Sequence, residues 1–193
     1  MKSVRLMLSL AALISLSTLA LAKSGPSPKT ADQAAPSEAQ QSFGTLKSLA
    51  GNWKGQVSVF PPQPDWKGSN LVGVTMRVTS RGNTLVHEMQ EAGTPLDPAK
   101  YDHPVSMFYV DSGQLTLVHY CDAGNRPRMA GRSSPDGKTI EFDFVDLSGG
   151  NQYGHMAHAL FTMVDANHHT EDWTYMMPGD KPVRAHFDLH RVN

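Results

Sequence analysis

The sequence predicts an all-β fold, a closed antiparallel up-and-down β-barrel of about ten strands with a short N-terminal helix plugging one end. Three observations predict it. Segments of alternating apolar and polar residues follow one another from Trp53 to Arg191, compact turn sequences separate them, and no segment between them is long enough for a crossover helix. An open meander of this length would expose two long strand edges, so closure into a barrel is expected.

The first residues have the pattern of a secretory signal peptide. Lys2 and Arg5 precede an apolar run from Leu6 to Leu21, and Ala20-Leu21-Ala22 supplies a small-x-small cleavage pattern. The run is interrupted by serines and a threonine and is shorter than the roughly 20 residues of a membrane-spanning helix. We therefore expect residues 1–22 to be removed, giving a bacterial-type exported protein, periplasmic or secreted, without membrane insertion after cleavage.

Composition narrows the functional classes. Cleavage would remove two of the 17 basic residues and none of the 18 acidic ones, leaving 171 residues with a net charge of −3. This charge argues against nucleic-acid binding, and the length suits one domain. Cys121 is the only cysteine, so no internal disulfide can form; we expect it to be a small, buried apolar residue.

Residues 23–42 are rich in Ser, Pro, Ala, Gln and Lys, a composition typical of a flexible tether. From Phe43 the pattern changes, because Phe43, Leu46 and Leu49 recur at helical spacing and end at Gly51. The sequence thus predicts a short amphipathic helix that opens a single barrel domain, residues 43–193.

Ten strands are expected after this helix. Their predicted ranges are 53–60, 71–79, 84–91, 105–110, 114–121, 126–133, 139–147, 155–164, 169–177 and 183–191.

The connections orient the barrel. Turns with Gly, Asn or Asp join alternate strand pairs at one end; they are Arg81-Gly82-Asn83, Asp111-Ser112-Gly113, Pro135-Asp136-Gly137 and Asp165-Ala166-Asn167. The longer connections, 61–70, 92–104, 122–125, 148–154 and 178–182, fall at the other end. We expect a closed base and an open mouth, where segment 61–70, with its prolines and Trp66, is either a lid or a plain surface connection.

The same parity brings Trp53 and Arg191 together at the base, where a guanidinium over the indole face would join the first and last strands. Gly51-Asn52-Trp53 after a short helix, with Arg191 ending the last strand, resembles the calycin superfamily, whose lipocalins, fatty-acid-binding proteins and nitrobindins carry a Gly-x-Trp on the first strand and a late Arg beside it. The resemblance covers residues 43–193 and implies a ligand-binding barrel. Ten strands without a disulfide are more similar to the fatty-acid-binding and nitrobindin-like barrels than to eight-stranded lipocalins.

Nitrobindin-like members are similar in holding haem through a histidine, and this chain has nine histidines. His186 and His190 lie on the last strand but alternate with Ala185, Phe187 and Leu189, which are expected to face inward. The resemblance therefore assigns no haem ligand in this chain.

Period-two alternation also predicts a polar cluster inside an otherwise apolar barrel. Its members are expected to converge near the mouth and contact a ligand; they are His87, His119, Arg128, His158, Glu171, Trp173 and Tyr175. An apolar lining with such a cluster favours a small apolar or mixed-polarity ligand.

Other functions remain open at this point. Histidines with a carboxylate suit a transition metal or acid–base catalysis, although no strand offers a clear His-x-His pair. No Gly-x-Ser-x-Gly motif occurs, and the sequence favours a binding protein over an enzyme. A structural or partner-binding role is the further alternative, because internal polar groups also satisfy one another in proteins without a ligand.

Overall fold

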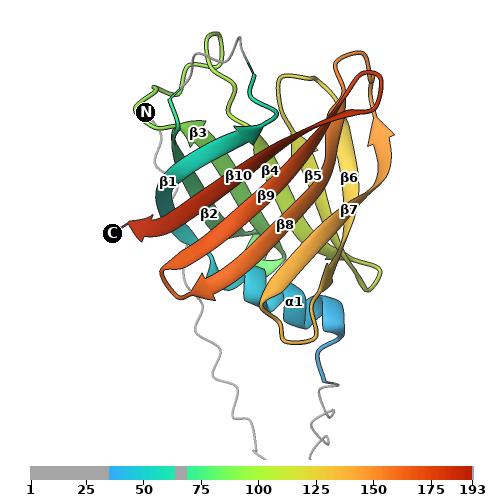
Figure 1. Cartoon of the computed structure of the whole chain (residues 1–193). Coiled ribbons are helices and arrows are strands. Elements are labelled where there is room, and N and C mark those ends of the chain that lie inside the picture. Colours follow the sequence, from blue (N-terminus) through green and yellow to red (C-terminus); the bar gives the residue numbers. More distant parts are fainter. Residues whose placement is uncertain (1–34, 64–68, 193) are drawn as a thin grey trace, which may run out of the picture. The chain divides into compact units, whose positions relative to one another are not determined.

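The structure, a computed structural model, describes residues 35–63 and 69–192. Ten antiparallel strands close into a barrel in the order β1-β10-β9-β8-β7-β6-β5-β4-β3-β2, which confirms the predicted meander (Figure 1). The strands are β1 (Gly51–Phe60), β2 (Leu71–Thr79), β3 (Thr84–Glu91), β4 (Val105–Asp111), β5 (Gln114–Tyr120), β6 (Arg126–Ser133), β7 (Thr139–Ser148), β8 (His155–Asp165), β9 (His168–Met177) and β10 (Lys181–Val192). No helix in the described ranges is long and apolar enough to cross a membrane.

Helix α1 (Glu38–Ser48) covers one end of the barrel, where it packs against β4, β5 and β6 (Figure 1). A capping box begins it: the Ser37 side chain accepts from the Gln40 backbone N–H, and the Gln40 side chain accepts from the Ser37 backbone N–H. The helix therefore starts within the predicted tether, whose upper limit of 42 is too late. The signal-peptide prediction and residues 23–34 of the tether lie outside the described residues.

The connections separate as expected. The tight turns lie at the α1 end, and the longer connections lie at the opposite end (Figure 1). The turn between β4 and β5 has Ser112 and Gly113 at φ of 50° and 83°, the left-handed pair that two-residue hairpins favour. A short 3₁₀ helix, η1 (Ser80–Gly82), joins β2 to β3. Trp66 and Pro64, which prompted the lid hypothesis, lie outside the described residues.

The interior of the barrel is packed with large side chains. Phe108, Phe142 and Phe161 are fully buried and meet edge to face, with ring centroids 5.4 to 6.1 Å apart. Gly131 faces inward where an added Cβ would lie only 2.5 Å from the Phe142 ring and 2.8 Å from Leu115. These contacts fill the interior of the barrel between β4, β6, β7 and β8.

The seam between the first and last strands is built as predicted. Trp53 pairs with Arg191 in the ladder, and the guanidinium carbon lies 4.1 Å from the indole centroid. Arg191 also donates to the backbone carbonyls of Ala50 (2.8 Å), Ser48 (3.1 Å) and Ala166 (3.0 Å), while the Trp53 indole N–H donates to the Leu49 carbonyl (2.8 Å). One arginine thereby ties the end of the helix, the β8–β9 turn and β1 to β10.

We expect both closing residues to contribute to stability. Trp53→Ala should lower the free energy of unfolding by about 3–5 kcal/mol through lost core packing, and Arg191→Ala by about 2 kcal/mol through lost hydrogen bonds and the cation–π contact. Chemical denaturation measures both, with the exposed Arg184 of the same strand as the control in Arg184→Ala. Unfolding curves for the Arg191 variant that match those of the control would contradict this role.

Candidate functional site

A buried polar cluster lies in the core of the barrel. It joins His87 on β3 to His169, Glu171 and Trp173 on β9, and each of these side chains is at most 2% exposed. The three β9 residues alternate along the strand and so share its inner face. The structure thus brings together His87, Glu171 and Trp173 of the predicted cluster and adds His169, which was not among the predicted ligand-binding residues.

Glu171 is the centre of the cluster. Its two oxygens lie 3.1 and 3.0 Å from the His87 Nε2, Oε1 lies 3.0 Å from the His169 Nε2, and Oε2 accepts from the Trp173 indole N–H at 2.9 Å. Burial raises the pKa of Glu171, but the His87 charge and the hydrogen bonds from His169 and His87 outweigh it and hold this pKa well below its usual range. The carboxylate is therefore ionised and saturated by donors.

His119 on β5 lies beside this group. Its Nδ1 is 2.9 Å from the Ser106 hydroxyl on β4, and its ring centroid is 5.6 Å from that of Trp173. Burial, with a smaller contribution from the charge of His87, lowers the pKa of His119 to about 4. His119 is therefore a neutral core histidine. Its partner Ser106 was not predicted, although the two residues are directly paired in the β4–β5 ladder.

The cluster is continuous with the barrel seam. The Trp53 ring meets His169 edge to face at 4.2 Å between centroids, and the Arg191 guanidinium lies over the same indole. Polar and aromatic groups thus run from the base into the core. We expected the cluster at the mouth of the barrel. Its members are instead buried in the core, and none of them lines the mouth pocket described below.

The cluster does not fit a haem or a metal ion. His87 lies between the rings of Phe108, Phe161 and Trp173, with centroids 5.7 to 6.3 Å away, so no space is left for a macrocycle. Among the described residues, three potential ligand atoms come within 4.8 Å of one another only in two groups on the outer surface. The Nδ1 atoms of His87 and His169 are buried without a hydrogen-bond partner. The arrangement is that of a donor-saturated carboxylate fixed in a core.

Two predicted members lie elsewhere. His158 faces outward, where its Nδ1 is 3.1 Å from Asp143. The β8–β9 ladder shows why: a register shift between Met156 and His158 turns Ala159 and Phe161 inward, so uninterrupted alternation along the strand gave the wrong face.

Arg128 is also on the outer face, where it pairs with Asp146. The inward residues of β6 are Pro127, Met129 and Gly131, and this sequence lacks the apolar alternation that marks an inner face. The expectation that Arg128 and His158 join the interior cluster is therefore wrong.

Tyr175 lies on the same face of β9 as Glu171 but nearer the mouth. Its hydroxyl donates to the Tyr153 carbonyl at 3.0 Å in the β7–β8 connection. Burial, with added effects of Cys121, Asp122 and Asp102, raises the pKa of Tyr175 to about 12. Its hydroxyl is therefore bonded to a connection at the mouth and not to Glu171.

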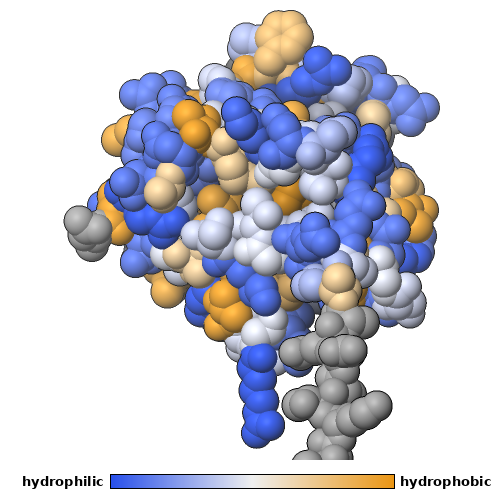
Figure 2. Space-filling view, turned by 90° about the horizontal axis from the view of Figure 1, so that it is seen from below, coloured by the Kyte–Doolittle hydropathy of each residue, from blue (hydrophilic) through white to orange (hydrophobic). Residues whose placement is uncertain are grey.

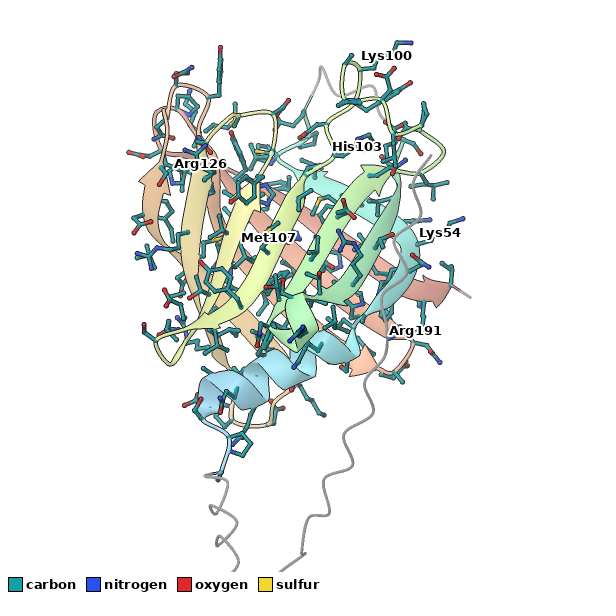
Figure 3. The ribbon with its side chains drawn as sticks, turned by 180° about the vertical axis from the view of Figure 1, so that it is seen from behind. Lys54, Lys100, His103, Met107, Arg126 and Arg191 are labelled. Carbon is teal, nitrogen blue, oxygen red and sulfur yellow. The ribbon has the colours of Figure 1, made fainter. Side chains whose placement is uncertain are left out.

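The mouth holds a pocket of about 450 Å³. Inward side chains of four strands form its apolar wall, and these are Val57, Val59, Val72, Met89, Ala185 and Phe187. Lys100, Tyr101, Asp102 and Pro104 of the β3–β4 connection form its rim, and Figure 3 shows Lys100 and His103 at this end of the barrel. Burial, together with the nearby Asp122, raises the pKa of Asp102 to about 6. The pocket therefore combines an apolar floor with a polar, titratable rim.

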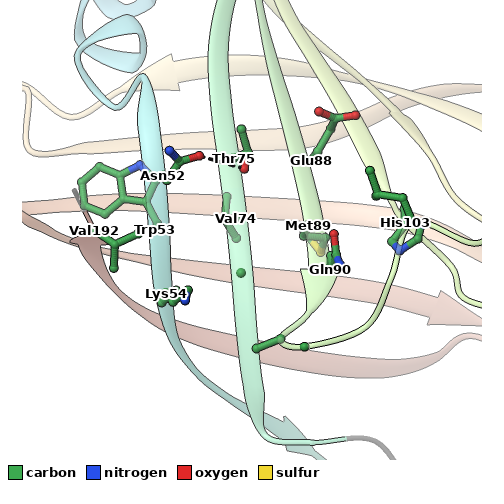
Figure 4. A pocket seen from close by; sticks show the side chains of 14 residues that line it. Asn52, Trp53, Lys54, Val74, Thr75, Glu88, Met89, Gln90, His103 and Val192 are labelled. Carbon is green, nitrogen blue, oxygen red and sulfur yellow. Dashed lines mark hydrogen bonds between the residues drawn. The ribbon is translucent and has the colours of Figure 1, made fainter.

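Other surfaces are less suited to an apolar ligand. A hollow of about 480 Å³ lies on the outside of β1, β2 and β3, where the polar side chains of Asn52, Lys54, Thr75 and Glu88 are mixed with apolar groups such as Leu96 and Val192 (Figure 4). The closed end, seen from below in Figure 2, mixes hydrophilic and hydrophobic side chains. The mouth pocket is the better candidate for a binding site.

The fold and the site define a closed ten-stranded antiparallel barrel with a polar group in its core and an apolar pocket at its mouth. The structure is similar to the crystal structure of Rv2717c from M. tuberculosis, with a TM-score of 0.57 and 16% sequence identity over 79% of this chain and 98% of that chain. A protein of unknown function from the DUF3598 family of Nostoc punctiforme PCC 73102 also matches, with a TM-score of 0.49, 9% identity, and coverage of 76% of this chain and 48% of that one. No family model matches the chain. No curated protein matches its sequence. The likeness to Rv2717c supports the barrel fold.

Proposed function

We propose that this protein is an exported, calycin-like barrel that binds one small, mainly apolar ligand in its mouth pocket. The observation that carries the proposal is the pocket wall, where inward apolar side chains of β1, β2, β3 and β10 continue the core and line an open pocket at the mouth. Apolar concave sites with a few polar groups are typical of small-molecule binding. Export rests on the N-terminal pattern of residues 1–22, and the calycin resemblance rests on the Trp53–Arg191 seam.

The proposal assigns the two polar regions different roles. Lys100, Tyr101 and Asp102 at the rim are placed to meet the polar end of a ligand, while the core cluster organises the barrel beneath it. Because Glu171 is fully buried and bonded on both oxygens, it offers no open position to a substrate. Binding therefore accounts for the geometry better than acid–base catalysis.

A fluorescent probe tests the proposal. We expect 1-anilinonaphthalene-8-sulfonate to bind the folded protein saturably, since it combines apolar rings with an anionic group. Ala185→Leu, which fills part of the pocket, should weaken probe binding by about fivefold or more, equivalent to about 1 kcal/mol of lost affinity.

The matched control places the same side chain outside the barrel. Ser58 is exposed on the outer face of β1 and should accept leucine without changing probe affinity at the mouth. Equal affinities for the Ala185 and Ser58 variants, or no saturable binding to the folded protein, would argue against the mouth as the ligand site.

A further inference from the structure

The outer face of β9 and β10 carries an unusual group of side chains. His168 on β9 is directly paired with His190 on β10, and Asp188 lies two residues before His190 on the same face. The three side chains are 26%, 63% and 53% exposed, respectively. This group takes no part in the mouth pocket or the buried cluster.

Its donor atoms converge. The Nε2 of His168 lies 2.6 Å from the Asp188 Oδ1, and the Nε2 of His190 lies 3.7 Å from the same oxygen. The two imidazoles stack, with centroids 4.3 Å apart and planes 21° apart, and one donor atom from each of the three side chains falls within 4.8 Å of the others. Both rings therefore present a nitrogen to one carboxylate oxygen.

We propose that His168, Asp188 and His190 bind a divalent transition-metal ion, with Zn²⁺ the best match. Imidazole nitrogen and carboxylate oxygen are ligands of Zn²⁺ at about 2.0–2.2 Å, which in a tetrahedron puts ligand atoms about 3.3–3.6 Å apart. The observed separations reach this arrangement through small side-chain rotations, and exposed side chains are free to make them. The ion would take the place of the proton between His168 and Asp188.

The surroundings distinguish this group from the other one on the outer surface. Glu141, Asp143 and His158 also lie within 4.8 Å of one another, but the Arg132 guanidinium is bonded to both carboxylates and already supplies a positive charge. Asp188, by contrast, has only imidazole nitrogens among the ion-pair contacts of the described residues. A bound cation would therefore balance the negative charge of Asp188.

The site also has an open side. Asp188 and His190 form part of the lining of a surface groove of about 610 Å³ with Lys54, Gln56 and Leu71. Three protein ligands beside open space leave the fourth tetrahedral position to water or a small anion. Lys54 lies opposite His190 in the β1–β10 ladder, so its ammonium group opposes a bound cation.

Calorimetric titration of the tag-free protein with Zn²⁺ tests the proposal. We expect one saturable site per chain, with affinity reduced about tenfold or more in His168→Gln, His190→Gln and Asp188→Asn, since even outer-shell changes cost 10- to 100-fold. Lys54→Gln should tighten binding by about two- to threefold, because it removes a nearby charge in a high-dielectric setting. His186→Gln is the matched control: His186 is an exposed histidine of the same strand and face, bonded to Asp172, and binding should be unchanged.

Histidine side-chain NMR gives an independent readout, in which Zn²⁺ should shift the ring nitrogens of His168 and His190 and leave those of His186 in place. Absence of saturable binding overturns the proposal. So does binding that persists in both His168→Gln and His190→Gln, or that is lost in His158→Gln and so belongs to the other group. The side chains lie outside the core, so circular dichroism of each variant should match the wild type.

Discussion

Glu171→Ala is expected to lower the free energy of unfolding by about 3–5 kcal/mol, the range for removing one partner of a buried charged pair. The substitution leaves three N–H groups, from His87, His169 and Trp173, without an acceptor inside the core, and it opens a cavity beside them. This loss is a large part of the 5–15 kcal/mol that typically stabilises a domain.

Chemical denaturation monitored by tryptophan fluorescence measures this effect. Asp172→Ala provides the control, because Asp172 is the next residue on β9 but is about half exposed on the outer face, and its loss should cost about 1 kcal/mol or less. If the two variants unfold at similar denaturant concentrations, the cluster does not organise the core.

His119 is expected to make stability depend on pH. Its pKa is about 4 in the folded protein and 6.5 for the free side chain, so unfolding takes up a proton between these values. The unfolded state binds more protons below pH 6.5, and the free energy of unfolding therefore falls as the pH is lowered towards 4. From pH 7 to pH 5 this group should account for a loss of about 2 kcal/mol.

Denaturation curves across this interval, for the wild type and His119→Gln, test the prediction. Glu171 does not interfere in this interval. Its pKa is lowered in the folded protein from the ordinary value of 4.5, so its contribution to the free energy of unfolding is lost only as the pH falls below about 4.5. In His119→Gln the free energy of unfolding should fall much less between pH 7 and pH 5 than in the wild type. His186→Gln, at an exposed histidine, is the control and should keep the wild-type fall. An unchanged pH profile in His119→Gln would mean that His119 is not held neutral by the fold.

Much of the fold could be predicted because it depends on local patterns. Strand ranges follow from period-two alternation, the tight turns follow from Gly, Asn and Asp, and the pairing of Trp53 with Arg191 follows from the parity of a meander. The helix start was missed because Ser37 and Gln40 form a capping box in a segment whose overall composition is that of a linker. A local hydrogen-bonding motif there outweighs the composition.

The site was less predictable, for reasons that differ between residues. A register shift in β8 turned His158 outward, and no feature of alternation reveals such a shift. On β6 the inward position 131 is a glycine because Phe142 and Leu115 fill the space, so the strand lacks the apolar signal that would have placed Arg128 outside. His87, His119, Glu171 and Trp173 were placed inward correctly because their strands keep strict alternation.

The seam between β1 and β10 has a consequence for how the chain reaches its native state. The contact of Arg191 with Ala50 joins residues 141 positions apart, and β10 follows the other nine strands along the described part of the chain. Contacts of such separation form slowly, and until they form the unpaired edges of β1 and β9 can pair with other chains. Closure of this barrel therefore requires β10, because without Lys181–Val192 the edges of β1 and β9 would both be unpaired.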